Sequence, residues 1–245
     1  MWIYGRNPVL EALRQDQVER LLIARGVKPG AVAELRKQAR EHDVPVDDVP
    51  RIDLDRALGT TSHQGVAAQL PELSFLSLEA ARDLARERGE RLLLVLLDHV
   101  QDPRNYGAII RSAEAFGAHG VVTEARRSAP LTGVVAKTAA GAASLVPLVQ
   151  VTNLPRTIRK LKDEGVWVYG ADADGDARPD GVDWDRDAAL VIGAEGRGLR
   201  RLVAELCDEL VRVPTPGRTP SLNASVATGV LLYAVRTGRD RRKGA

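Results

Sequence analysis

From residue 91 onward, short apolar runs alternate with stretches of helical periodicity, and this alternation constrains the fold more than any other feature of the chain. The runs cover residues 92–97, 120–123, 145–151, 166–169, 189–192 and 210–213. Strands that are apolar along their whole length are buried on both faces, and helices between them connect parallel strands. The alternation therefore predicts an α/β domain with a mostly parallel sheet and helices on both faces.

Helical patterns lie between and after these runs. They cover residues 106–116, 131–143 and 153–161, a segment after the loop at 193–198, and a last helix that begins near Ser221 and Asn223. Asn153 stands where an N-cap is expected, because its side-chain oxygen can accept a hydrogen bond from a free amide of the first turn. These lengths fit the crossover connections that parallel strands require.

The first 70 residues have an alternation of their own. Asn7 and Pro8 predict a helix start, with an asparagine cap and a proline in the first turn. The expected elements after that helix are a strand at 21–24, a helix at 31–41, a short strand at 44–46, helical turns at 52–58 and a strand at 65–70. We predict a small N-terminal α/β domain at 1–70, a linker with one charged helix at 71–90, and a second domain at 91–245.

Composition excludes several classes of protein. Cys207 is the only cysteine, which excludes an intramolecular disulfide and a cysteine-based metal site. The four histidines lack a metal-ligand spacing, and we expect them on the surface or in loops. No apolar run reaches the ~20 residues of a membrane-spanning helix, and the first residues lack the apolar core of a signal peptide. We expect a cytoplasmic protein that uses no metal.

Net charge does not decide the partner. The formal charge is +2, and residues 1–70 have as many acidic as basic side chains. Domains that bind nucleic acid through its phosphates usually have a larger basic surplus. The C-terminal segment is basic, but charged termini are common, so it is weak support for RNA binding. Its cations are Arg236, Arg239, Arg241, Arg242 and Lys243.

The loop Gly193-Ala-Glu-Gly-Arg-Gly198 follows one of the apolar runs and invites comparison with nucleotide-binding loops. Its spacing is GxxGxG rather than the GxGxxG of dinucleotide-binding proteins, it lies near the C-terminal end, and the chain has no P-loop motif. What remains is a loop whose glycines let backbone groups approach a ligand closely, with the carboxylate of Glu195 projecting from it. The alternative is a tight strand–helix connection with a solvated glutamate.

Two other polar groups are expected at the same sheet edge, because the carboxyl ends of parallel strands meet there. Asn105 and Arg111 follow the first strand of the domain and lie on one helix. Ser221 and Asn223 open the last helix, where free amides favour anions and hydroxyl groups. The alternatives are a helix cap for each asparagine and a surface cation for Arg111.

These three motifs together resemble those of the SpoU/TrmH superfamily of RNA ribose 2′-O-methyltransferases. The motifs are residues 105–112, 192–196 and 221–227, and the resemblance covers residues 91–237. Residues 1–70, with Tyr4-Gly5 and His63-Gln64-Gly65, resemble the L30e-like substrate-binding domain of the ribosomal branch. Residues 151–154 and the helix after them are most similar to bacterial 23S rRNA guanosine 2′-O-methyltransferases.

The resemblance implies a fold and a cofactor. The second domain would have a SPOUT-like C-terminal trefoil knot, with the loops 193–198 and 214–222 against each other. The cofactor would be S-adenosylmethionine. Its implied binding residues are Gly193, Ala194, Glu195, Gly196, Val213, Pro214, Ser221, Leu222 and Ala227.

The implied reaction is attack of the ribose 2′-oxygen of a guanosine in 23S rRNA, in the peptidyl-transferase region, on the sulfonium methyl group. The implied catalytic residues are Arg111, Asn105, Glu195, Ser221 and Asn223. Arg111 is often described as the base in this family. A guanidinium is a poor proton acceptor at neutral pH, so orienting the 2′-hydroxyl and stabilising the developing alkoxide is physically easier.

The resemblance also implies partners: 23S rRNA or a large-subunit precursor, and a second copy of the chain bound through the last helix and the 193–198 loop. One alternative is methylation of tRNA or of another 23S nucleotide. Family members that act on tRNA typically lack a separate N-terminal unit, which argues against tRNA. The other alternative is an RNA-binding protein with a degenerate methyltransferase fold, against which the five catalytic positions argue.

Overall fold

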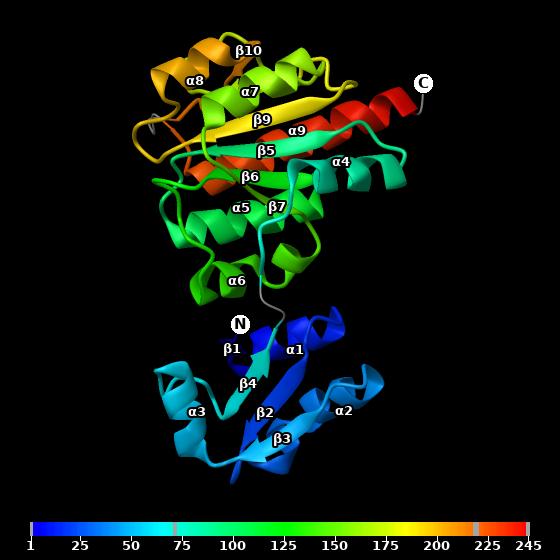
Figure 1. Cartoon of the computed structure of the whole chain (residues 1–245), viewed down its shortest axis with the longest axis vertical. Coiled ribbons are helices and arrows are strands. Elements are labelled where there is room, and N and C mark those ends of the chain that lie inside the picture. The colour runs from blue at the N-terminus through cyan, green and yellow to red at the C-terminus, as the bar shows by residue number, and fades with distance from the viewer. Residues whose placement is uncertain (1, 71–72, 218–220, 244–245) are drawn as a thin grey trace. The chain divides into compact units, whose positions relative to one another are not determined.

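In the computed structural model the chain divides into two units, and each is described by itself. The structure describes residues 2–70, 73–217 and 221–243, without the side chain of Lys243 (Figure 1). The first unit contains residues 1–73 and 131–144, and the second contains residues 74–130 and 145–245. The sequence pattern assigned 131–143 to the second domain. Their helix α6 (Gly133–Ala139) instead contacts the first strand of the first unit.

The first unit is built on a four-stranded sheet in the order β1-β4-β2-β3. Strands β2 and β3 are parallel, and β4 runs antiparallel to both β1 and β2. The strands are β1 (Trp2–Tyr4), β2 (Arg20–Ala24), β3 (Val46–Val49) and β4 (Val66–Gln69). The helices are α1 (Arg6–Arg14), α2 (Ala33–Glu41) and α3 (Arg51–Leu58). The sequence did not indicate the three-residue strand β1.

Alternating side chains of this sheet enter two apolar clusters. Leu21 and Ile23 pack with residues of α1 and α2, whereas Ala24 packs with Leu54 of α3. Helix α1 begins at Arg6, with Gly5 in the cap position at a φ of 92°, so the prediction that Asn7 is the cap was wrong. Glycine occupies this backbone conformation without the strain that a side chain would bring.

The second unit confirms the predicted mostly parallel sheet: among its described residues, all five pairings of the six strands are parallel. The strand order is β10-β8-β9-β5-β6-β7. The strands are β5 (Leu93–Asp98), β6 (Gly120–Glu124), β7 (Leu148–Val151), β8 (Trp167–Ala171), β9 (Ala188–Gly193) and β10 (Glu209–Val211). The central strands β5 and β9 are buried along their whole length, which is why both read as unbroken apolar runs.

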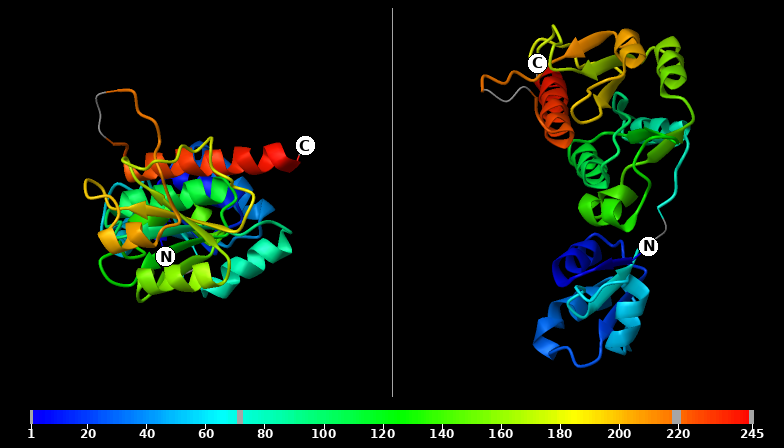
Figure 2. Two further views of the ribbon diagram at one scale, coloured as in Figure 1. Left: turned by 90° about the horizontal axis from the view of Figure 1, so that it is seen from above. Right: turned by 90° about the vertical axis from the view of Figure 1, so that its left-hand side faces the viewer.

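Helices cover both faces of this sheet (Figure 2). They are α4 (Leu78–Glu87), α5 (Pro103–Ala115), α7 (Leu154–Asp163), α8 (Arg201–Leu206) and α9 (Ala224–Lys243). Helices α4, α7 and α8 share one apolar cluster with sheet residues such as Leu94 and Leu96. Helix α9 packs against α5 and contacts β9. Because strand side chains alternate, the other residues of β5 face the opposite side.

The strand order places a ligand site. The chain passes outward from β5 to β6 and β7, and then returns to place β8, β9 and β10 on the other side of β5. The neighbours β5 and β9 are therefore followed by connections that run in opposite directions. In open parallel sheets, ligands bind at the carboxyl ends of the strands at such a switch point.

Two of the histidines lie in loops, as expected, but are not on the surface. His63 and His119 are fully buried, and each has hydrogen-bond partners on both ring nitrogens.

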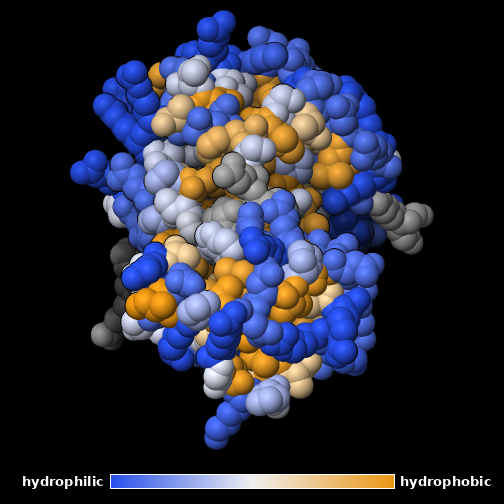
Figure 3. Space-filling view, turned by 60° about the horizontal axis from the view of Figure 1, so that its bottom comes forward, coloured by the Kyte–Doolittle hydropathy of each residue, from blue (hydrophilic) through white to orange (hydrophobic). Residues whose placement is uncertain are grey.

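On the face of the molecule drawn in Figure 3, apolar residues lie in groups separated by hydrophilic ones. Among the described residues, no helix is long and apolar enough to cross a membrane.

Candidate active site

A cavity of about 350 Å³ opens at the carboxyl ends of β8, β9 and β10. Its apolar floor includes Ile192, Val211 and Leu231, and the rest of its wall comes mainly from three loops. The loops are residues 171–174 after β8, 193–198 after β9, and 213–222 before α9, of which 218–220 lie outside the described residues. The cavity lies at the carboxyl edge of the sheet, on the β8 and β10 side of the switch point between β5 and β9.

The glycine loop after β9 is closed by its own backbone. Ala194 N donates to Gly198 O (3.1 Å), and Gly198 N donates to Ala194 O (2.9 Å). A Cβ atom built on Gly193 would lie 2.2 Å from the carbonyl carbon of Gly198, which no side chain tolerates. The glycine at 193 is therefore required for the loop to close on itself.

Most of the residues predicted to bind the cofactor line this cavity. Gly193, Ala194, Glu195, Gly196, Val213, Ser221, Leu222 and Ala227 do so, whereas Pro214 does not. Sequence reasoning missed the contribution of β8, whose end supplies Asp172 and Asp174. The acidic segment after that strand was recognised only as a loop, although its position after a buried strand was the available indication.

Three of the predicted catalytic residues form one hydrogen-bonded group. Asn223 Nδ2 donates to Asn105 Oδ1 (3.1 Å) and to Glu195 Oε1. Asn223 Oδ1 accepts from the backbone N of Ser225 (2.9 Å), which caps α9. A single side chain thus joins α5, the glycine loop and the start of α9.

The alternatives stated for the two asparagines have different outcomes. Asn223 is a cap, as the alternative proposed, but its amide also bridges the two other residues. Asn105 is not a cap, because Asp102 Oδ1 accepts from Arg104 N (2.9 Å) at the start of α5. Asn105 is buried, at 7% exposure, and its oxygen faces Asn223.

Asn223→Asp separates the two roles of this residue. Aspartate still caps a helix, but it replaces the Nδ2 donor by an oxygen that faces the oxygens of Asn105 and Glu195. We expect the free energy of unfolding at neutral pH to fall by about 1–3 kcal/mol, measured by urea denaturation. Asn7→Asp, at an exposed position of α1, is the matched control. Equal stability of N223D and the wild type would contradict the bridging role.

Arg111 and Ser221 complete the predicted set. Ser221 lines the cavity and is exposed. Arg111 is exposed on α5 and is not part of the described cavity lining. It lies six residues after Asn105, which is about 120° around the helix, so the two side chains do not share one face of α5.

An ionic network around two buried carboxylates, which sequence reasoning missed, connects the segment after the glycine loop to the sheet. Arg200 donates from its backbone N (2.7 Å) and from Nε (2.5 Å) to the carboxylate of Asp98 at the end of β5. Its Nη2 donates to Glu124 Oε2 at the end of β6 (3.0 Å). The Asp98 side chain is completely buried, so removing its cation would leave a costly unpaired charge.

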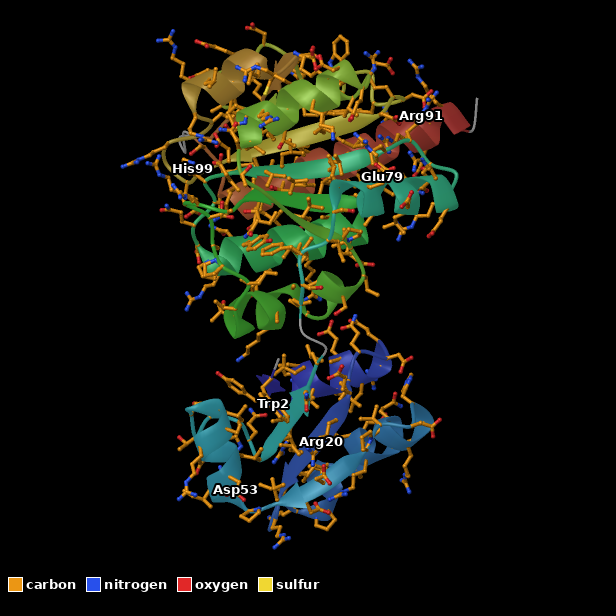
Figure 4. The ribbon with its side chains drawn as sticks, viewed as in Figure 1. Trp2, Arg20, Asp53, Glu79, Arg91 and His99 are labelled. Carbon is orange, nitrogen blue, oxygen red and sulfur yellow. The ribbon has the colours of Figure 1, made fainter. Side chains whose placement is uncertain are left out.

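The same network reaches two further elements. Glu124 Oε1 accepts from Leu154 N at the start of α7 (3.0 Å), and His99 Nε2 lies 3.1 Å from Glu124 Oε2. His99 follows β5 directly (Figure 4) and has a φ of 61°. The indication in the sequence was that Asp98 and Glu124 each end an apolar run.

The chain's cysteine is not poised for nucleophilic catalysis. Burial raises the pKa of the Cys207 thiol to about 12, and the Sγ donates to Val203 O (3.3 Å). A thiol attacks as its thiolate, which is negligible here at neutral pH. The polar groups that face the cavity or join its loops are instead carboxylates, amides, hydroxyls and the guanidinium of Arg197.

Comparison with known proteins agrees with this architecture. Residues 92–233 match the SpoU rRNA Methylase family, and residues 2–76 match the family described as RNA 2′-O ribose methyltransferase substrate binding. An uncharacterized tRNA/rRNA methyltransferase of Mycobacterium sp. (strain KMS) is 43% identical over 98% of this chain and 76% of that protein. The TrmH family protein YacO of Bacillus subtilis (strain 168) is 40% identical, over 98% of this chain and 96% of its own length.

A solved methyltransferase structure is similar to almost the whole chain. The SpoU methyltransferase AviRb from Streptomyces viridochromogenes, crystallised with AdoMet, has a TM-score of 0.74 and 26% identity. The similarity covers 98% of this chain and 90% of that one. Since the family match covers more than half of the chain and both relatives are similar along almost all of it, the protein belongs to the SpoU/TrmH family of tRNA/rRNA methyltransferases.

Proposed function

We propose that the protein transfers the methyl group of S-adenosylmethionine to the ribose 2′-hydroxyl of a guanosine in 23S rRNA. The observation that carries the proposal is the bridge made by Asn223. It ties Glu195 of the cavity wall to Asn105 of the first family motif. Glu195 lines the cavity, so the bridge brings the three family motifs together beside it.

The cavity fits S-adenosylmethionine. Its volume of about 350 Å³ is in the range of small-molecule sites. The apolar floor suits an adenine ring, and the small residues of the glycine loop leave backbone amides and carbonyls accessible. Three carboxylates, Asp172, Asp174 and Glu195, outnumber the lining cation Arg197, and the net negative charge favours a cofactor with a positive sulfonium and amino group.

The bound cofactor supplies an activated methyl group, so the chain itself has to position the RNA and manage charge and the proton. Arg111 would bind a phosphate next to the target ribose and stabilise negative charge developing on the 2′-oxygen. Glu195, held by Asn223, offers a carboxylate to accept a hydrogen bond at the cavity. Asn105 holds Asn223 in place, and Ser221 offers a hydroxyl on the same wall.

We infer that the protein acts as a homodimer through α9 and the 193–198 loop, as the family resemblance implies, with the α5 side of α9 in the interface as well. Val226, Val230 and Tyr233 of α9 are 51%, 39% and 59% exposed, and they border a shallow groove against α5. The double variant Val230→Asp, Tyr233→Asp is expected to sediment as a monomer, because burying two carboxylates in such an interface is costly. Leu202→Asp, an equally exposed position on α8, is expected to leave the dimer unchanged.

Single-turnover methyl transfer from labelled S-adenosylmethionine to protein-free 23S rRNA and to bulk tRNA tests the proposed function. Label recovered as 2′-O-methylguanosine from 23S rRNA alone is the expected result. Label in tRNA would keep the chemistry and overturn the substrate. No label in either RNA, with the cofactor still bound, would point to a large-subunit precursor, and no cofactor binding would overturn the enzymatic proposal.

A further inference from the structure

Besides the cofactor cavity of the second unit, a cavity of about 600 Å³ lies in the first unit, and its polar lining is basic. It lies between the start of α1, the loop after β2 and the start of α3. Its cations are Arg6, Arg25, Lys28 and Arg51, and Gln64 completes its polar lining. All five side chains are exposed. No carboxylate lines this cavity among the residues that the structure describes.

The cations around this basic pocket differ from four others in the same unit, although among the described residues Arg40 and Arg56 also form no ion pair. Arg14, Arg20, Arg36 and Lys37 each form an ion pair with a carboxylate of the unit. Within the described residues, none of the four pocket cations forms an ion pair; Arg25 Nε donates to the backbone oxygen of Asp48 (3.2 Å). Residues 1–70 have equal numbers of acidic and basic side chains, so neutral composition conceals a local concentration of unpaired positive charge.

Gln64 of the motif His63-Gln64-Gly65 lines the pocket, and the motif Tyr4-Gly5 directly precedes its lining residue Arg6; the described lining of the cofactor cavity includes neither motif. Gln64 Oε1 accepts from the backbone N of Arg6 (3.0 Å), which leaves its Nε2 as a donor. A Cβ built on Gly65 would lie 2.5 Å from Val27 Cγ2, so only glycine lets the loop after β2 approach this turn.

The buried side chain of His63 stabilises the turn at residues 63–65 through hydrogen bonds. It is completely buried, its Nδ1 accepts from Gly65 N (3.0 Å), and its Nε2 lies 2.7 Å from Asp55 Oδ1. An accepting Nδ1 places the ring hydrogen on Nε2, facing the carboxylate. The pocket therefore has a fixed, hydrogen-bonded wall beneath its exposed cations.

We propose that this basic pocket binds the phosphodiester backbone of the RNA substrate. Arginine and lysine with no carboxylate partner are the side chains that replace counterions on RNA phosphates. The amide of Gln64 and the N-terminal end of α1 add donors on the same side. The inference rests on the proposed function only in taking RNA as the substrate, and it assigns this unit a site distinct from the cofactor cavity.

The test compares two full-length triple variants with the same change in net charge. Arg25→Gln, Lys28→Gln, Arg51→Gln removes pocket cations, and Arg14→Gln, Arg20→Gln, Arg36→Gln removes paired cations of the same unit. Binding to protein-free 23S rRNA is measured across a series of salt concentrations. We expect the slope of log K against log salt to fall by about 2 in magnitude for the pocket variant, with at least tenfold weaker binding at low salt. The control variant is expected to keep the wild-type slope.

The outcomes separate this proposal from the proposed function. Wild-type protein that binds but does not methylate 23S rRNA would defeat the function, and loss of binding in the pocket variant alone would still support the pocket. Equal losses in both variants, or wild-type binding by the pocket variant, would overturn the proposal. If the triple variant fails to fold by circular dichroism, Arg51→Gln alone is compared with Arg20→Gln by the same slopes. A pocket specific for free phosphate would leave the RNA slope unchanged while inorganic phosphate still raised the wild-type melting temperature, which would also overturn it.

Discussion

Arg111→Ala is expected to slow methyl transfer at least 10²- to 10³-fold while cofactor affinity stays at the wild-type value. Removing one preorganised donor to a developing oxyanion costs a factor of this size. Arg111 is outside the described lining of the cofactor cavity, which is why we expect cofactor affinity to be kept. The rate is measured under single-turnover conditions with saturating RNA, and S-adenosylmethionine affinity by calorimetry.

Two further variants make this result specific. Arg111→Lys keeps the charge but loses the planar fork, so we expect it to recover only part of the rate. Arg159→Ala removes an exposed arginine from α7 and is expected to behave as the wild type. Wild-type turnover by R111A would remove Arg111 from the mechanism, and a parallel loss of cofactor binding would show that its role is structural.

Gly193→Ala is expected to abolish cofactor binding, with affinity reduced at least 100-fold, and to lower the free energy of unfolding by about 1–3 kcal/mol. The added methyl group would lie 2.2 Å from Gly198 C and 2.5 Å from Leu199 N. These are backbone atoms, so no rotamer change relieves the overlap. Opening the loop would break the paired hydrogen bonds between Ala194 and Gly198. Calorimetric titration and urea denaturation measure the two effects.

Gly217→Ala is the control for this variant. It lies in the loop before α9, and a Cβ built there meets nothing within 4 Å. We expect its cofactor affinity and stability to match the wild type. Normal binding by G193A would show that the loop opens at little cost, and the explanation of this glycine would then be wrong.

The sheet of the second unit was predictable because strands that are buried on both faces, such as β5 and β9, have unbroken runs of apolar residues in the sequence. The position of the cavity followed from the same pattern, since the carboxyl ends of parallel strands share one edge. The loop residues that follow those strands, such as 193–196, could therefore be assigned to one cavity. The trefoil knot stays a prediction of the family resemblance.

Features that depend on contacts between distant residues could not be predicted. Arg200 contacts Asp98 only once β5 has paired with β9, and the sequence around either residue does not indicate its partner. The second role of Asn223 depends on how α9 packs against α5. The basic pocket could not be predicted from composition, because the acidic and basic side chains of residues 1–70 are equal in number, which hides the local concentration of cations at the pocket.

The pairing of β5 with β9 has a consequence for biosynthesis. Leu93 pairs with Ala188, and β6 and β7 are both translated before β9 leaves the ribosome. During that interval β5 has one neighbour and an open apolar edge, which is the kind of surface that chaperones shield and that aggregates when it is left bare. Pairing over so long a separation is also slow. The nascent chain therefore carries an unfinished sheet until its last quarter is made, and a truncation that ends before β9 exposes that edge permanently.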